Sequence, residues 1–150
     1  SKKMNFSNRI KIAEIIKKNS TYAIGSASVK EIFDLNILKA SLLSMKRAIE
    51  NLSKKPNLIL IDGPFAPEGI KNYKTIINGD DKIKCISAAS VIAKTYRDLL
   101  MIKLSEKFSN YAWESNFGYG TKAHLDGLKK FGVTTHHRRG FKPIHKILSR

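Results

Sequence analysis

The chain is poor in cysteine, proline, acidic residues and long apolar stretches, and each shortage excludes a class of protein. Its 150 residues include one cysteine, Cys85, and four prolines. A single cysteine cannot form an internal disulfide, and no apolar signal-peptide core follows Lys2-Lys3. We therefore expect a reducing, cytoplasmic location, with Cys85 as a small buried residue. The longest plainly aliphatic run covers only residues 58–61, whereas a membrane-spanning helix needs about 20 residues.

Composition thus excludes a membrane protein, and 42% hydrophobic residues exclude a disordered polar chain. Acidic residues are scarce: 12 Asp and Glu stand against 28 Lys and Arg, for a formal net charge of +16. Such a charge concentrates polyanions, with nucleic acid as the first candidate and anionic lipid as the second. No acid follows Asp126, and the bases beyond it are Lys129, Lys130, Arg138, Arg139, Lys142, Lys146 and Arg150. A solvated, solubilising surface or lysine-rich codon usage is the alternative explanation.

Helical and strand-like segments alternate along the chain. Apolar periodicity predicts helices over residues 7–18 with Ser7 as cap, from residue 30 to about 52, over about 87–108, and over 121–131. For the last of these, Thr121 is the expected cap and Gly132 the expected stop. Strands are predicted over residues 21–29, 58–61 and 74–77. The alternation predicts a single α/β domain over residues 1–150, with helices packed on a sheet.

Two carboxylates follow predicted strands, each beside a glycine. Asp62 ends the aliphatic run, and Asp80 follows Asn78-Gly79 after the next strand. Strand ends gather functional side chains at one sheet edge in α/β proteins. Carboxylate oxygens there are hard ligands for divalent cations, which suits phosphodiester chemistry in a basic protein. For each aspartate alone, an ordinary Asp-Gly turn is the alternative.

Three further segments suit contact with a nucleic-acid backbone. Ser87 and Ser90 lie near a predicted helix start, where hydroxyls bind anions or simply cap the helix. Tyr119 lies between two glycines, so it either stacks on a sugar or base or packs in its loop.

The run His136-His137-Arg138-Arg139 suits phosphate contact, with a solvated loop as the alternative. A zinc site is not favoured there, because further ligands are lacking. His124 and His145 are expected to be packing or surface histidines.

Taken together, eight segments resemble bacterial type 2 ribonuclease H in their order and spacing, over essentially the whole chain. They are Ser1-Lys2-Lys3, Asp34–Leu38, Leu60–Gly63, Asn78–Asp80, Ile86–Lys94, Arg97-Asp98, Gly118–Thr121 and His137–Phe141. The resemblance implies a ribonuclease H-like mixed sheet flanked by helices, with a helical C-terminal part. It also implies cleavage of the RNA strand of RNA–DNA hybrids, and nicking at ribonucleotides embedded in DNA, with Mn²⁺ or Mg²⁺. No protein partner is implied.

The same resemblance assigns roles to particular residues. Asp62 and Asp80 match the third and fourth of four catalytic, metal-binding carboxylates, whereas Asp98 matches a position that we interpret as structural. Tyr119 matches the tyrosine that senses the ribonucleotide junction. The residues that match a backbone-contacting motif or are weaker candidates for such contact are Lys2, Lys3, Ser87, Ser90, Arg138 and Arg139.

The sequence also departs from the family pattern. The first two carboxylates normally lie in an Asp-Glu-x-Gly-Arg-Gly motif on the first strand, which these 150 residues do not contain. The chain starts at the second residue of an Asp-Ser-Lys-Lys motif, and Gly140 stands where the family has serine. We therefore expect the opening strands to be missing, the sheet edge to be exposed, and the chain alone to be inactive or nearly so. A non-enzymatic, basic nucleic-acid-binding module and another metal nuclease of the same fold are the competing hypotheses.

Overall fold

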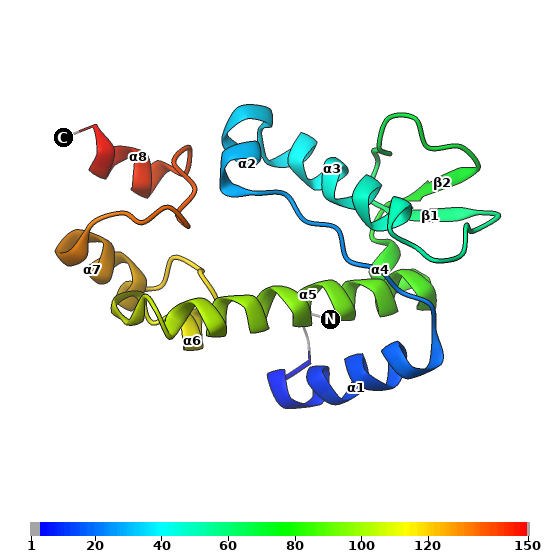
Figure 1. Ribbon diagram of the computed structural model, residues 1–150, viewed down its shortest axis with the longest axis horizontal. Coiled ribbons are helices and arrows are strands. Elements are labelled where there is room, and N and C mark those ends of the chain that lie inside the picture. Colours follow the sequence, from blue (N-terminus) through cyan, green and yellow to red (C-terminus); the bar gives the residue numbers. More distant parts are fainter. Residues whose placement is uncertain (1–3, 150) are drawn as a thin grey trace. The chain divides into compact units, whose positions relative to one another are not determined.

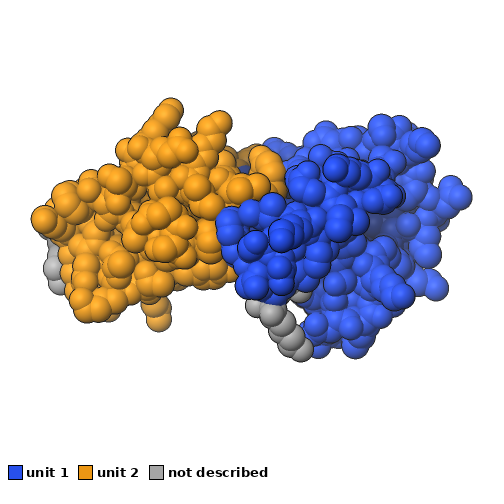
Figure 2. All heavy atoms as spheres, turned by 90° about the horizontal axis from the view of Figure 1, so that it is seen from below, with its two compact units in different colours: residues 1–27, 37–95 blue, residues 28–36, 96–150 orange. Residues whose placement is uncertain are grey.

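The computed structural model describes residues 4–149, in which helices outnumber strands (Figure 1). The chain divides into two compact units (Figure 2). Unit 1 comprises residues 1–27 and 37–95, and unit 2 comprises residues 28–36 and 96–150. Within the described residues, no helix is long and apolar enough to cross a membrane. Lys2 and Lys3 lie outside the described residues.

Unit 1 is built around a short parallel sheet. Its elements are α1 (Phe6–Asn19), α3 (Ile37–Glu50), β1 (Ile59–Asp62), β2 (Tyr73–Ile76), α4 (Gly79–Lys82) and the first half of α5 (Lys84–Ser105). The β1 and β2 strands pair in parallel, and the register runs from Ile59 opposite Tyr73 to Asp62 opposite Ile76. These two strands form the sheet of the described residues. Ile61 is its buried residue at 4% exposure, which agrees with the aliphatic run that predicted this strand.

The predicted strand over residues 21–29 is wrong, because the segment is held by side chains of α3 instead of a neighbouring strand. Arg47 Nη1 donates to the Ser26 carbonyl at 2.7 Å, and Asn51 Nδ2 donates to the Ile24 carbonyl at 3.1 Å. Gly25 lies so close to α3 that a Cβ there would collide with its backbone. The β-prone residues therefore form an extended connection pressed against a helix.

Two other predicted boundaries also need correction. The long helix up to residue 52 is two helices, α2 (Val29–Leu35) and α3, because Asn36 has a φ of 70° and interrupts the helical backbone. The cap of α1 is Asn5, whose side chain accepts from the Asn8 amide at 2.9 Å, and Ser7 lies inside the helix. Both features depend on local backbone geometry that apolar periodicity does not report.

Unit 2 is helical. Besides α2 and the second half of α5, it contains η1 (Ser109–Tyr111), α6 (Trp113–Asn116), α7 (Lys122–Phe131) and α8 (Lys142–Leu148). The predicted cap and stop of α7 are confirmed: Thr121 accepts from the His124 amide, and Gly132 ends the helix with a φ of 77°. The buried core consists of Met101, Tyr111, Trp113, Leu128 and Ile144.

Candidate active site

Asp62 is fixed at the carboxyl end of β1 by a backbone amide. The side chain is exposed, and its Oδ1 accepts a hydrogen bond from the Gly79 amide at 2.8 Å. The chain reaches this position because Asn78 adopts a left-handed conformation, with a φ of 55°, just after β2. Gly79 itself is buried, and a Cβ there would lie 2.7 Å from Ile86 Cδ1. A side chain at this position would therefore force the Ile86 side chain to move.

Asp80 follows this glycine directly and is half-buried. It lies in the first turn of α4, whereas we expected it at a strand end, because β2 already stops at Ile76. The Gly63 amide donates to the Ile76 carbonyl at 3.0 Å, so the two strands stay paired up to this point. Asp80 is thus the residue directly after Gly79, whose amide hydrogen-bonds to Asp62.

The carboxylates of Asp62 and Asp80 could supply some, but not all, of the ligands of a divalent cation. Carboxylate oxygens are the ligands that Mg²⁺ and Mn²⁺ prefer. No described residue hydrogen-bonds to Asp62 Oδ2 or to the Asp80 carboxylate, so these oxygens are open to a ligand. However, residues 4–149 contain no group of three or more His, Cys, Asp or Glu residues that could hold a metal ion. The pair is therefore a partial ligand set.

Ser87 and Ser90 lie on the helix that packs against Gly79. Helix α5 begins at Lys84, earlier than predicted, so both serines are in its first two turns and half-buried. The Ser87 amide donates to the Ile83 carbonyl at 2.9 Å as part of the helix start. Cys85, expected to be buried, is exposed, because it lies about 100° around the helix axis from buried Ile86.

Tyr119 projects from a tightly bonded loop of unit 2. Its side chain is 63% exposed. The loop turns through positive φ angles at Phe117 and Gly118, and Asn116 ties it down from both directions. Asn116 Oδ1 accepts from the Gly118 amide at 2.8 Å, and its Nδ2 donates to the Tyr111 carbonyl at 2.7 Å. An exposed aromatic ring on a rigid backbone is suited to contact with a large ligand.

Arg97 is a candidate that our sequence reasoning did not single out. Burial lowers the pKa of its guanidinium, and the nearby positive charge of Arg138 lowers it further, while Asp98 and Tyr119 oppose the effect. A Cβ at Gly118 would lie 3.2 Å from Arg97 Nη2, so the arginine reaches the Tyr119 loop. Two cations held close together beside an exposed tyrosine are suited to an anionic ligand.

The remaining candidate residues of unit 2 fall into two groups, exposed side chains and buried ones. Arg138 and Arg139 are exposed, as phosphate contact requires, and so is His145. His137, expected to share this contact, is only 5% exposed, so its ring is turned into the interior; His124 is also buried. Asp98 is completely buried, in keeping with the structural role that we assigned to it.

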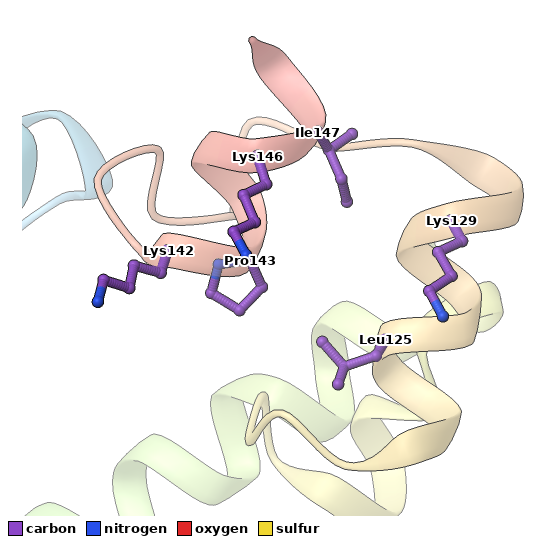
Figure 3. Close-up of a pocket in the computed structure, with 6 residues that line it drawn as sticks. All are labelled: Leu125, Lys129, Lys142, Pro143, Lys146 and Ile147. Atoms are coloured by element: carbon purple, nitrogen blue, oxygen red, sulfur yellow. The ribbon is translucent and has the colours of Figure 1, made fainter. Parts of the chain in front are cut away.

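A basic hollow lies between α7 and α8 (Figure 3). It has a volume of about 360 Å³. Its lining residues are Leu125, Lys129, Lys142, Pro143, Lys146 and Ile147. Three apolar side chains thus share the hollow with three lysines of the acid-free C-terminal segment, which extends the positive surface of unit 2.

The fold and the site thus define the class of a basic α/β protein with one carboxylate at the end of β1 and a second in the first turn of α4. The family model described as Ribonuclease HII matches residues 1–144. A ribonuclease HII of Pelagibacter ubique is 54% identical over 150 residues, covering 99% of this chain and 80% of the relative. One from Ruegeria pomeroyi is 46% identical over 149 residues, covering 99% and 64%. The chain therefore belongs to the ribonuclease HII family.

A solved structure agrees with this assignment at the level of the fold. The crystal structure of the ribonuclease H2 from Pyrococcus horikoshii OT3 superposes with a TM-score of 0.79 at 24% identity, covering 100% of this chain and 79% of that one. The predicted α/β ribonuclease H-like fold is thereby confirmed, although the described residues contribute only a small parallel sheet to it.

Proposed function

We propose that this chain carries half of the metal site and part of the substrate surface of an endonuclease. The enzyme cleaves the RNA strand of RNA–DNA hybrids and nicks DNA at embedded ribonucleotides, the first step in excising them. The observation that carries the proposal is the pairing of Asp62 with the Gly79 amide, directly before Asp80, in a chain of net charge +16. The free thiol of Cys85 suits a reducing cytoplasm.

Asp62 and Asp80 would hold Mn²⁺ or Mg²⁺. When bound, such cations activate a water molecule and stabilise the leaving 3′ oxygen of an in-line displacement. The Gly79 amide occupies Asp62 Oδ1 and so orients the carboxylate, leaving Oδ2 for the cation. A hydrogen bond to a ligating carboxylate fixes its orientation and tunes its affinity.

Two carboxylates are half of the set that the family resemblance implies. The other two belong to the Asp-Glu-x-Gly-Arg-Gly motif, which is absent from these 150 residues. We therefore propose that the 150-residue chain, tested alone, cleaves hybrids weakly or not at all, although it still binds them through its basic surface.

Recognition of the substrate falls to unit 2 and to the start of α5. Tyr119 contacts the junction between ribonucleotide and deoxyribonucleotide, where the 2′-hydroxyl distinguishes RNA from DNA. Arg138 and Arg139 contact backbone phosphates, with weaker contributions from Ser87 and Ser90, and Lys2 and Lys3 are further candidates for this contact. These contacts position the substrate, and the carboxylates act on it.

The test compares the chain alone with a chimera in which a family Asp-Glu-x-Gly-Arg-Gly segment precedes residue 1. We expect Mn²⁺-dependent cleavage of an RNA–DNA hybrid by the chimera and little or none by the chain. Asp62→Asn in the chimera should abolish cleavage and spare metal-free binding, whereas Asp81→Asn, at an exposed neighbouring aspartate, should spare both. Full cleavage by the Asp62→Asn chimera would refute the role of Asp62, and binding without cleavage by the unaltered chimera would favour a non-enzymatic binding module.

A further inference from the structure

The two buried histidines of unit 2 belong to a continuous hydrogen-bond network that ends on the backbone of Tyr119. His124 Nδ1 lies 2.9 Å from the Tyr119 carbonyl oxygen. His124 Nε2 lies 3.2 Å from Trp113 Nε1 and 3.1 Å from His137 Nε2. At the far end, His137 Nδ1 lies 3.0 Å from the Thr134 amide nitrogen. The network therefore connects three separate segments to the loop that carries the exposed tyrosine.

The groups at its two ends leave one arrangement of protons. The Thr134 amide can only donate, so His137 Nδ1 accepts and His137 Nε2 carries the proton. The Tyr119 carbonyl can only accept, so His124 Nδ1 carries the proton and its Nε2 accepts from both Trp113 and His137. This tautomer assignment follows from the hydrogen bonds. In this arrangement all four ring nitrogens have a partner.

We propose that His124 and His137 are positioning residues for Tyr119, which they hold at the substrate surface through its carbonyl group. The inference rests on the recognition role proposed above for Tyr119. Tyr119 is 63% exposed, and its carbonyl group fixes the backbone from which the ring extends. The Tyr119 carbonyl oxygen also accepts from the Thr121 amide at 2.8 Å. It is therefore bonded both within its loop and to the buried histidine.

Protonation breaks this arrangement. A proton on His124 Nε2 would face two donors, and a proton on His137 Nδ1 would face the Thr134 amide and would need Thr134 Oγ1, 2.9 Å away, to accept it. The titratable groups that face His137 are His124 from α7, Tyr111 from η1 and its neighbour His136. Burial lowers the pKa of His137 to about 4, with His124 and His136 lowering it further and the Thr134 hydrogen bond raising it. The network is thus intact at neutral pH and opens in acid.

Two substitutions of His124 distinguish its hydrogen bond to the Tyr119 carbonyl from its packing in the interior. In His124→Asn, the side-chain amide can still donate from the δ position to the Tyr119 carbonyl, but the ε acceptor is lost. In His124→Gln, the carbonyl oxygen can still accept from Trp113 at the ε position, but the donor to Tyr119 is lost. His145→Gln, at an exposed histidine of α8, is the matched control.

The first readout is the fluorine NMR signal of Tyr119 in protein labelled with 3-fluorotyrosine, assigned among the five tyrosines by Tyr119→Phe. We expect His124→Gln to shift this signal towards that of the unfolded chain, and His124→Asn and His145→Gln to leave it in place. The second readout is the preference, in metal-free binding, for a DNA duplex with one ribonucleotide over an all-DNA duplex. That preference should fall about fivefold in His124→Gln, as expected for one hydrogen bond of about 1 kcal/mol.

An unchanged Tyr119 signal in His124→Gln, or equal shifts in both His124 variants, would overturn the positioning role. If either variant fails to fold, an acid titration of the unaltered chain replaces it: the Tyr119 signal and the fluorescence of the single tryptophan, Trp113, should change with one midpoint. Separate midpoints would count against the proposal. If the Tyr119 signal responds but Tyr119→Ala leaves the binding preference intact, positioning stands and the recognition role of Tyr119 fails.

Discussion

His137 should make the stability of unit 2 depend on pH in a defined range. Its pKa is lowered from an ordinary value of 6.5 to about 4, mainly because the ring is buried. The unfolded chain therefore takes up a proton near pH 6.5, whereas the folded chain resists until about pH 4. The stabilisation from this neutral histidine is complete above pH 6.5 and is lost as the pH falls towards 4.

The size of the effect follows from the shift. A difference of about 2.5 pKa units, at 1.36 kcal/mol per unit, is at most about 3 kcal/mol of unfolding free energy. Because carboxylates also titrate in this range, the informative quantity is the difference between the unaltered chain and His137→Gln. That difference should be largest at pH 7 and shrink by up to about 3 kcal/mol between pH 6.5 and pH 4.

Urea unfolding followed by Trp113 fluorescence measures this difference, because the only tryptophan is hydrogen-bonded to His124 inside the same network. His145→Gln is the control, and its stability relative to the unaltered chain should not depend on pH in this way. A difference between the unaltered chain and His137→Gln that stays constant from pH 7 to pH 4 would refute the reasoning, since it would mean that the buried ring titrates normally.

Three further predictions concern local packing and capping, all read out by urea unfolding. Gly79→Ala should cost about 1–3 kcal/mol, because the new Cβ meets Ile86 Cδ1 at 2.7 Å, and it should also weaken metal binding by Asp62. Gly25→Ala should cost at least as much, since its Cβ collides with the backbone of α3, whereas Gly120→Ala, in open space, should be nearly neutral. Asn5→Ala should cost about 1 kcal/mol and Ser7→Ala much less; the reverse order would contradict the observed cap of α1.

Strands β1 and β2 and helix α7 were predictable because their signals are local. The aliphatic run before Asp62 forms β1, and Thr121 and Gly132 bound α7 as their residue types indicate. Residues 21–29 misled because small and β-branched side chains also suit a segment pressed against a helix, and only the tertiary contacts of Gly25 reveal which occurs. Asn36 interrupts a helix that periodicity would continue.

The site was predictable in its residue types but not in its bonds. Asp62 and Asp80 are identified from their place after aliphatic segments and from the family resemblance. The Gly79 amide that donates to Asp62 is a backbone group, which the sequence shows only as a glycine. Arg97 and the histidine pair were missed for a different reason: their partners are distant in sequence, as with His124 and His137, or depend on a loop turned through positive φ angles, as with Gly118.

The contact between Gly79 and Asp62 also bears on how related chains can be assessed. Because the glycine has no side chain, its amide reaches one aspartate while the peptide bond that follows carries the other. Under the proposed function these three positions act together, so a change at the glycine should affect metal binding as a change at either acid does. Under the proposed function, a chain that keeps both aspartates but replaces this glycine is expected to bind the metal ion more weakly. Related sequences, including partial ones, can thus be compared at three positions: Asp62, Gly79 and Asp80.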